Sequence, residues 1–363
     1  MYDQPTSVTI SERIQVVMVF AILAYQTGLR NHRHAAEKME ASHHWVHYAL
    51  SHYRHLFHDK TLASLQAMAL IMVHFRNLPK PGFTWNFTNR VLVRAIELDY
   101  HRDPDKIELP AEQQNLLSKE LRKRVFHSLL GICITIGCRV GKPAPWHFQH
   151  IDVPLPMAIK DSEISTAGVS TSLSGQCDLW GCIHLSKLLP LLAELHNNII
   201  SVRRSAPEYT RTVEILDAKI IAWRQDWETS IQHEVKHVNL SVASLLIETW
   251  GAEYQLYLHH PVCCTAPEML EKNLETCHKA ARRLLQAFHT LSSRYKGVDF
   301  TWHSTVAYAA GFGITLHVYR QRKSVVVQEQ FDQMRNELKG WMSLMAYADL
   351  VLRKFVWHST RFI

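Results

Sequence analysis

The sequence is poor in the two residues that most often interrupt helices, with 13 glycines and 13 prolines among 363 residues. Together with an apolar fraction of 47%, this scarcity excludes fibrous and low-complexity chains and indicates a globular protein with a substantial core. Long apolar runs are also missing. The segment 14–25 comes closest, but it contains Gln15 and is shorter than the roughly 18 residues that a bilayer-spanning helix needs. We therefore expect no membrane partner.

Paired zinc-binding cysteines and a secretory signal are absent as well. No two of the seven cysteines form a C-x2-C pair, the spacing that most zinc fingers use. The segment 1–13 contains an early acidic residue, Asp3, and does not run from basic to apolar as a secretory signal does. An odd number of cysteines spread through apolar segments is typical of reduced thiols in a cytosolic or nuclear protein.

Motifs of known enzyme classes are missing, with one partial exception. The chain has no phosphate-binding loop, dinucleotide fingerprint or nucleophile elbow. His233, Glu234 and His237 match the HExxH pattern, in which two histidines one helical turn apart hold zinc and the glutamate acts as base. Lys236 would place a cation beside that metal, and the flanking residues are polar, so we expect a solvated helix end. A zinc hydrolase stays a remote alternative, and we predict a protein that is not an enzyme and has no metal or cofactor of its own.

Histidine and basic residues are abundant without forming an obvious site. The N-terminal histidines alternate with aromatic residues, which favours a half-buried amphipathic helix, while a metal site and a pH-sensitive surface are the alternatives. The net charge of +7 arises from lysines and arginines scattered among acidic residues, apart from a cluster at 119–124. We expect a mildly basic protein that does not bind a defined DNA site by itself. These histidines are His32, His34, His43, His44, His47, His52, His55 and His58.

Helical signals extend along the chain and predict an all-α, multi-helix bundle. Thr9 and Glu12 form a capping-box pattern at the start of a helix that we expect to end at Gly28. Apolar residues at three- and four-residue spacing define one buried face in the segment 61–77, and the segment 77–82 is a firm break. Clean alternation with period two is absent, so a sheet is not expected. Further helices are predicted at 31–58, 83–100, 111–140, 179–203, 207–237, 241–260, 266–294, 301–322 and 327–357.

A Ser- and Thr-rich segment without aromatic residues divides the chain and is expected to be a mobile loop. The helices on both sides are amphipathic and need a partner to pack against, so we do not expect independent domains. The expected parts are N-terminal helices at 1–58, a core at 59–160, the loop at 161–178 and a C-terminal helical part at 179–363.

The segment 120–156 carries the most specific pattern. It runs from an acidic residue and a basic triplet through an apolar helix to a Gly-Lys-Pro break and an Asp-Val-Pro-Leu-Pro loop. This order resembles the signature of the fungal transcription-factor regulatory domain, the helical middle region of binuclear zinc-cluster regulators. The residues that match the signature are Glu120, Arg122, Arg124, Gly141, Lys142, Pro143, Asp152 and Pro156.

Other segments resemble the same family in the expected order. The segment 62–67 is similar to its Ser-Leu-Gln-Ala helix, the segment 98–103 to its Leu-Gly-Leu-His-Arg-Asp helix end, and the segment 258–261 to its Leu-His-Arg-Pro end. Two residues of the signature segment differ from the family pattern. Lys142 replaces the usual Arg, which exchanges a two-pronged donor for a point charge, and Cys133 replaces the usual Asp.

The resemblance implies a nuclear transcriptional regulator of a fungal metabolic or secondary-metabolite pathway, whose regulatory domain senses an effector or partner. DNA binding and zinc would belong to an upstream six-cysteine cluster, which this chain lacks, so DNA is a partner only in the full-length context. The alternative is a co-regulator that does not bind DNA and acts through a homo- or heterodimer. We expect an effector site between the segments 83–101 and 143–156, where Trp85, His101, Arg102, Lys142 and Trp146 could converge.

Overall fold

The three- and four-residue spacing of apolar side chains produces helices along most of the chain. The computed structural model describes residues 8–30, 32–143, 147–170, 177, 179–231, 238–295, 301–322 and 327–359. Within these ranges the all-α prediction is confirmed, and none of the helices is long and apolar enough to cross a membrane. The helices are α1 (Ile10–Arg30), α2 (Ala35–Ser51), α3 (Tyr53–His58), α4 (Leu62–Phe75), α5 (Pro81–Glu97), α6 (Leu116–Arg139), α7 (Trp180–Leu195), α8 (Ala206–Ile231), α9 (Val238–Leu258), α10 (Leu270–Tyr295), α11 (Trp302–Arg322) and α12 (Gln328–Ser359).

The first helix begins as predicted but does not end as predicted. The Glu12 carboxylate accepts from the backbone N–H of Thr9 at 2.9 Å, and the Thr9 hydroxyl accepts from the N–H of Glu12 at 3.2 Å, which confirms the capping box. The expected stop at Gly28 is wrong, because α1 continues to Arg30. A Cβ atom at Gly28 would lie 3.3 Å from the carbonyl oxygen of Ala35, so this glycine permits close packing of α2.

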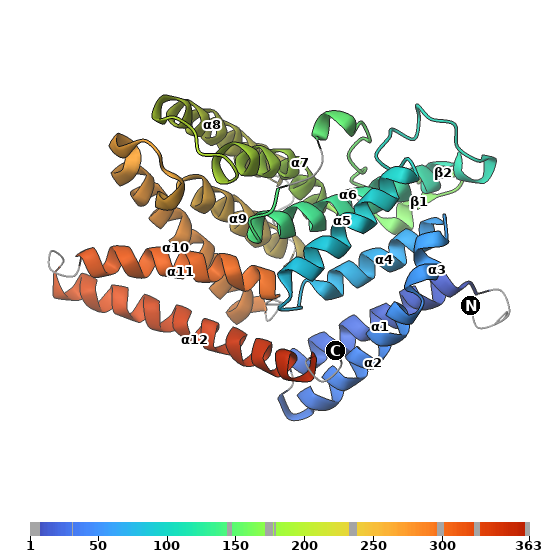
Figure 1. The fold of residues 1–363 in the computed structure, drawn as a ribbon, viewed down its shortest axis with the longest axis horizontal. Helices are drawn as coiled ribbons and strands as arrows, with labels where there is room; N and C mark the ends of the chain where they lie inside the picture. The colour runs from blue at the N-terminus through green and yellow to red at the C-terminus, as the bar shows by residue number, and fades with distance from the viewer. Residues whose placement is uncertain are drawn as a thin grey trace.

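The helices pack in two groups that share a continuous apolar interior. The hairpin of α1 and α2 packs on α4, and α6 is enclosed by α4, α5 and α7. The later helices α9, α10 and α11 form a second group, and α12 returns along it to contact α2 (Figure 1). One cluster of buried apolar residues extends from Ile14 to Met269 and therefore crosses the boundaries at residues 58 and 178. A second cluster joins α9 to α12.

The described part of the Ser- and Thr-rich segment has a regular structure. A 3-10 turn at Asp161–Glu163 leads into a two-stranded antiparallel hairpin of β1 (Ile164–Ser165) and β2 (Gly168–Val169). This small hairpin is a sheet that the sequence did not predict. It forms beside α6, where the side chain of Ile164 is buried. Residues 171–176 and 178 of the expected loop lie outside the described residues.

Candidate ligand pocket at the signature helix

The signature segment forms the central helix α6. Asn115 caps its N-terminus by accepting a hydrogen bond from the backbone N–H of Ser118 at 2.9 Å. Its buried apolar residues form two adjacent rows along the helix, one with Val125, Leu129 and Cys133 and the other with Phe126, Leu130 and Ile134. A helix that is buried on several sides can line contacts with several neighbours at once.

The acidic residue of the signature fastens the following loop to α6. The Glu120 side chain is 1% exposed, and its Oε1 accepts from Nε of Arg124 at 3.1 Å and from the backbone N–H of Met157 at 2.8 Å. Arg124 in turn donates to the carbonyl oxygen of Ile159 at 3.0 Å and pairs with Asp161. These charge-assisted hydrogen bonds hold the segment 156–161 against the helix.

Arg122 fastens the opposite side of α6 to the end of α5. Its guanidinium lies 3.9 Å from the centre of the Tyr100 ring and donates to the carbonyl oxygens of Leu98 and Asp99 at 3.2 and 3.1 Å. Asp99 has a positive φ of 58°, the left-handed conformation that ends many helices. The family usually carries glycine here, and the structure explains that preference by the backbone conformation.

The Gly-Lys-Pro break acts through its backbone. Gly141 has a φ of 65°, and the N–H of Lys142 donates to the carbonyl oxygen of Gly137 at 2.9 Å, which closes the C-terminus of α6. The Lys142 side chain and Pro143 are exposed. In the next loop, Oδ1 of Asp152 accepts from the N–H of Asp103 at 3.0 Å, so this loop is tied to the segment after α5.

Of the residues predicted to form an effector site, Trp85 and Lys142 both lie beside Gly137 of α6, since a Cβ atom at Gly137 would be 3.7 Å from the Trp85 Nε1 and 3.2 Å from the Lys142 carbonyl oxygen. The Trp85 indole lies against α6 beside Gly137, and its Nε1 is buried without a hydrogen-bond partner. His101 is half-buried, and its carbonyl oxygen accepts from the N–H groups of Asp152 and Val153 at 3.1 Å, whereas Arg102 is exposed. Trp146 lies outside the described residues. A site at this place stays a prediction.

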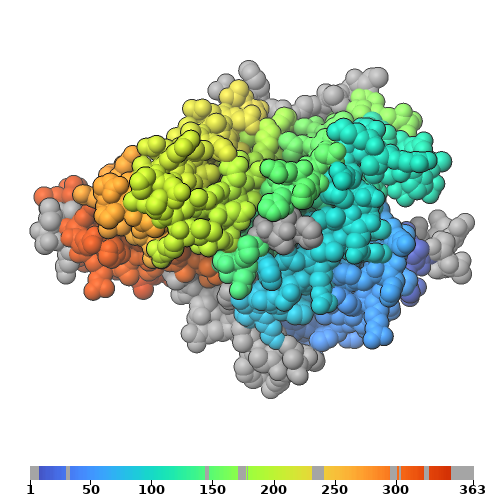
Figure 2. Space-filling model, turned by 45° about the horizontal axis from the view of Figure 1, so that its top comes forward, coloured from blue at the N-terminus to red at the C-terminus, as the bar shows by residue number. Residues whose placement is uncertain are grey.

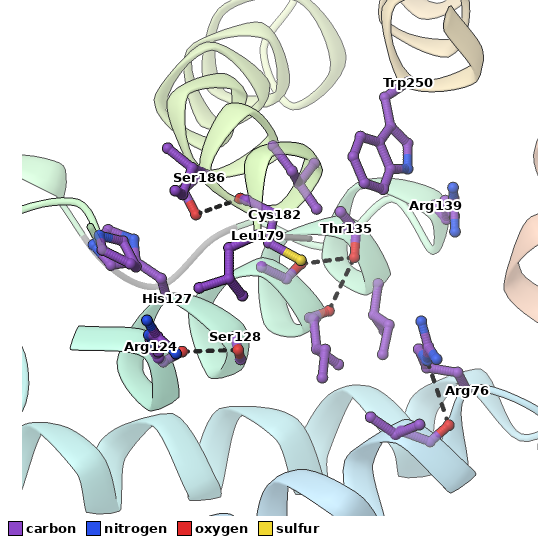
Figure 3. Close-up of a pocket in the computed structure, with 17 residues that line it drawn as sticks. Arg76, Arg124, His127, Ser128, Thr135, Arg139, Leu179, Cys182, Ser186 and Trp250 are labelled. Carbon is purple, nitrogen blue, oxygen red and sulfur yellow. Dashed lines mark hydrogen bonds between the residues drawn. The ribbon is translucent and has the colours of Figure 1, made fainter. Parts of the chain in front are cut away.

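A cavity of about 310 Å³ lies elsewhere, on the side of α6 that faces α7. Figure 3 shows Ser128 and Thr135 on α6 opposite Cys182 and Ser186 on α7, with Trp250 reaching in from α9. Figure 2 shows that the segments around 80–120 and 190–225 reach the same face of the molecule. The lining residues are Val73, Arg76, Arg124, His127, Ser128, Gly131, Ile132, Thr135, Ile136, Arg139, Pro156, Leu179, Cys182, Ile183, Leu185, Ser186 and Trp250.

Two arginines of the cavity wall are engaged by carboxylates behind it. Arg139 at the end of α6 donates from Nε and Nη2 to the two carboxylate oxygens of Glu253 on α9, both at 2.7 Å, and the Tyr257 hydroxyl donates to the same carboxylate at 3.1 Å. The Arg139 and Glu253 side chains are 14% and 8% exposed. Arg124 is engaged by Glu120 and Asp161 in the same way. The wall is therefore polar but locally neutralised at these two positions.

Histidine and cysteine side chains near the cavity are uncharged. Burial lowers the pKa of His127, whose Nε2 lies 3.0 Å from the carbonyl oxygen of Pro154. Burial also raises the pKa of the Cys182 thiol, so the thiolate is disfavoured. Both shifts favour the neutral forms of these side chains.

The metal sites considered from the sequence receive no support from the described residues. His233, Glu234 and His237 lie outside the described residues. Across the described ranges, no group of three His, Cys, Asp or Glu side chains is placed to hold a metal ion.

Comparison with known proteins assigns the family. Residues 1–232, which include α6 and the signature loop, match the family described as fungal specific transcription factor domain. The chain belongs to this family. No solved structure matches this chain.

One curated relative of this fungal transcription factor domain is the negative regulator of pleiotropic drug resistance STB5 from Candida glabrata. The two proteins are 25% identical over 120 residues, which cover 33% of this chain and 12% of the relative. The aligned part is thus a small fraction of a much longer protein.

The sequence singled out Arg124 and Pro156 as structural residues of the signature and gave no sign that they line a cavity, and it did not point to Arg139, Cys182 or Trp250. Arg139 stands at the polar end of an apolar helix, where a surface position is the usual interpretation. Its partner Glu253 is 114 residues away along the chain, so no local pattern connects the two.

Proposed function

We propose that this chain is the regulatory region of a fungal transcriptional regulator and that its cavity between α6 and α7 takes a small-molecule effector. The family match over residues 1–232 supports the regulatory role. The observation that carries the effector role is the position of the cavity. Its walls include Arg124 and Pro156 of the signature as well as Trp250 of α9, so a bound molecule would contact the family core and the C-terminal helices together.

In this role the chain acts in the nucleus, and the full-length regulator contacts DNA through a separate module. The chain carries out no enzymatic reaction. Occupation of the cavity would change how α7 and α9 pack on α6. A partner protein of the transcription machinery would bind one of these two packing arrangements more tightly than the other. A ligand shifts such an equilibrium only through its different affinity for the two states.

A tethered reporter assay tests the regulatory role. Residues 1–363 are fused to an unrelated DNA-binding domain, and we expect reporter output to differ from that of the DNA-binding domain alone. Thr135→Phe, which fills the cavity, should shift this output by at least about fivefold, the scale of a typical coupling between sites. The matched control is Thr212→Phe, since Thr212 is a half-buried threonine of α8, as Thr135 is of α6, with the same hydrogen bond to its own helix.

Equal output from the fusion and the bare DNA-binding domain would contradict the regulatory role. A shift by Thr212→Phe as large as that by Thr135→Phe would contradict the role of the cavity. Circular dichroism of both variants establishes that the helices are intact. The co-regulator alternative would be favoured if the fusion changes reporter output only when a second protein is bound to it and is recovered with it.

A further inference from the structure

We infer that the cavity selects a neutral molecule with an apolar body and at least one N–H or O–H donor. This inference rests on the proposed effector role of the cavity and specifies the chemistry of its ligand. It follows from three properties of the wall: apolar surfaces on several helices, hydroxyl groups that donate to their own helix, and the pairing of Arg124 and Arg139 with carboxylates.

The apolar surfaces determine the body of the ligand. Val73 of α4, Ile132 and Ile136 of α6, Ile183 of α7 and Trp250 of α9 approach the cavity from different directions. Such a wall favours a ligand that removes apolar surface from water, and a cavity of about 310 Å³ is at the small end of the range of ligand sites. The Trp250 side chain reaches toward the cavity (Figure 3), and aromatic side chains pack well against flat rings.

The hydroxyl groups determine the polar part of the ligand. Ser128 donates to the carbonyl oxygen of Arg124 at 2.8 Å, Thr135 to that of Gly131 at 2.7 Å and Ser186 to that of Cys182 at 2.9 Å. A hydroxyl group has one proton and two lone pairs, so each of these oxygens can still accept a hydrogen bond but has no proton left to donate. A ligand that supplies its own N–H or O–H therefore complements them.

The charges of the wall disfavour ions. None of the 17 described residues that line the cavity is Asp or Glu, so an ammonium group would lie near arginines without an adjacent carboxylate of the wall. A carboxylate would instead compete for Arg124 with Glu120 and Asp161, and for Arg139 with Glu253. An unpaired ion that loses part of its hydration at the apolar wall pays a desolvation cost. A neutral donor avoids both penalties.

Calorimetric titration of the full chain with four naphthalene probes tests this inference. 2-Naphthol is neutral and has an O–H donor, and 2-methoxynaphthalene retains the oxygen without the proton. 2-Naphthoate is an anion, and 2-(aminomethyl)naphthalene is a cation at pH 7. We expect 2-naphthol to bind about fivefold to tenfold more tightly than 2-methoxynaphthalene, the gain from one neutral hydrogen bond, and more tightly than either ion.

Substitutions in the cavity wall test which residues produce the preference for 2-naphthol. Thr135→Val and Ser186→Ala should each reduce the advantage of 2-naphthol over 2-methoxynaphthalene at least about threefold while the protein stays folded. Thr212→Val and Ser230→Ala are matched controls, since these residues of α8 make the same hydrogen bond to their own helix away from the cavity, and they should leave the advantage unchanged.

Three results would overturn the inference: equal affinity for 2-naphthol and its methyl ether, tightest binding of either ion, or no binding of any of the four probes. These results are independent of the reporter assay. A confirmed preference for 2-naphthol together with a reporter that ignores Thr135→Phe would leave the ligand chemistry standing and contradict the effector role. A reporter that responds to Thr135→Phe, together with no preference for 2-naphthol, would support the effector role and contradict the ligand chemistry.

Discussion

At the scale of single residues, Asp99 occupies a backbone conformation that suits glycine better. A residue with a Cβ atom pays roughly 1–2 kcal/mol for a left-handed φ, although Asp tolerates it better than most. The Asp99 side chain is exposed, and Arg122 contacts only its carbonyl oxygen by hydrogen bond. We predict that Asp99→Gly raises the free energy of unfolding by about 0.5–1 kcal/mol in urea denaturation. Asp99→Ala is the control, since it keeps the strain, and a gain there equal to that of glycine would contradict the explanation.

The buried carboxylate of Glu120 should be far more costly to remove than an exposed one. Its loss leaves Arg124, which is 14% exposed, without its partner on α6 and leaves the N–H of Met157 unsatisfied. We predict that Glu120→Ala lowers the free energy of unfolding by about 3 kcal/mol. Glu97→Ala is the comparison, because Glu97 also pairs with an arginine of its own helix but is 55% exposed. That substitution should cost less than about 1 kcal/mol, and equal costs would refute the role of burial.

At the scale of elements, the pair Arg139–Glu253 joins α6 to α9 beside the cavity. Arg139→Met and Glu253→Leu should each cost about 3–5 kcal/mol, because each leaves a buried charge unpaired. The double substitution should cost clearly less than the sum, since no charge then remains buried. Urea denaturation of the four proteins measures this coupling.

The more exposed pair of Arg282 with Glu337, whose side chains are 44% and 23% exposed, is the matched control and should show a coupling below about 1 kcal/mol. Strictly additive costs for Arg139 and Glu253 would show that the two residues do not stabilise the interface between α6 and α9 as a unit.

At the scale of the whole molecule, buried histidines make stability depend on pH. Burial lowers the pKa of His74 to about 3 and that of His278 to about 4, whereas an unfolded histidine titrates near 6.5. The unfolded chain therefore binds protons first. This stabilisation is complete above about pH 6.5 and is lost progressively as the pH falls toward the folded pKa values. Burial lowers the pKa in the same direction for His101, His127, His184, His196 and His260.

We predict a lower melting temperature at pH 5 than at pH 7.5. His74→Leu removes one such group, so it should reduce the loss of stability between pH 6.5 and 5 by about 1.7 kcal/mol, since an unfolded histidine is already half protonated at pH 6.5. The exposed His55 is the control, and His55→Gln should keep the pH profile of the native chain. A native profile that is flat from pH 7.5 to 5 would contradict the prediction.

The sequence alone was sufficient for the family and for most of the helices, although the helix predicted at 31–58 is divided into the 3-10 turn His32–His34, α2 and α3. Hydrogen bonds of a helix join residues four apart, so the apolar spacing of α4 and the capping box of α1 are visible within short segments. The family signature is likewise contiguous. Gly141 closes the end of α6 by contacts within one helical turn, whereas Glu120 and Asp152 also reach Met157 and Asp103, which are 37 and 49 residues away along the chain. The end of α1 was misjudged because the role of Gly28 depends on the approach of α2.

The cavity was decided only by the tertiary structure. Arg124 and Pro156 could be named in advance, but they line a cavity only because α7 and α9 pack opposite α6. The pairing of Arg139 with Glu253 and the position of Trp250 depend in the same way on contacts between distant segments. Periodicity reports which face of a helix is buried, whereas the partner of that face is selected by the packing of the whole interior.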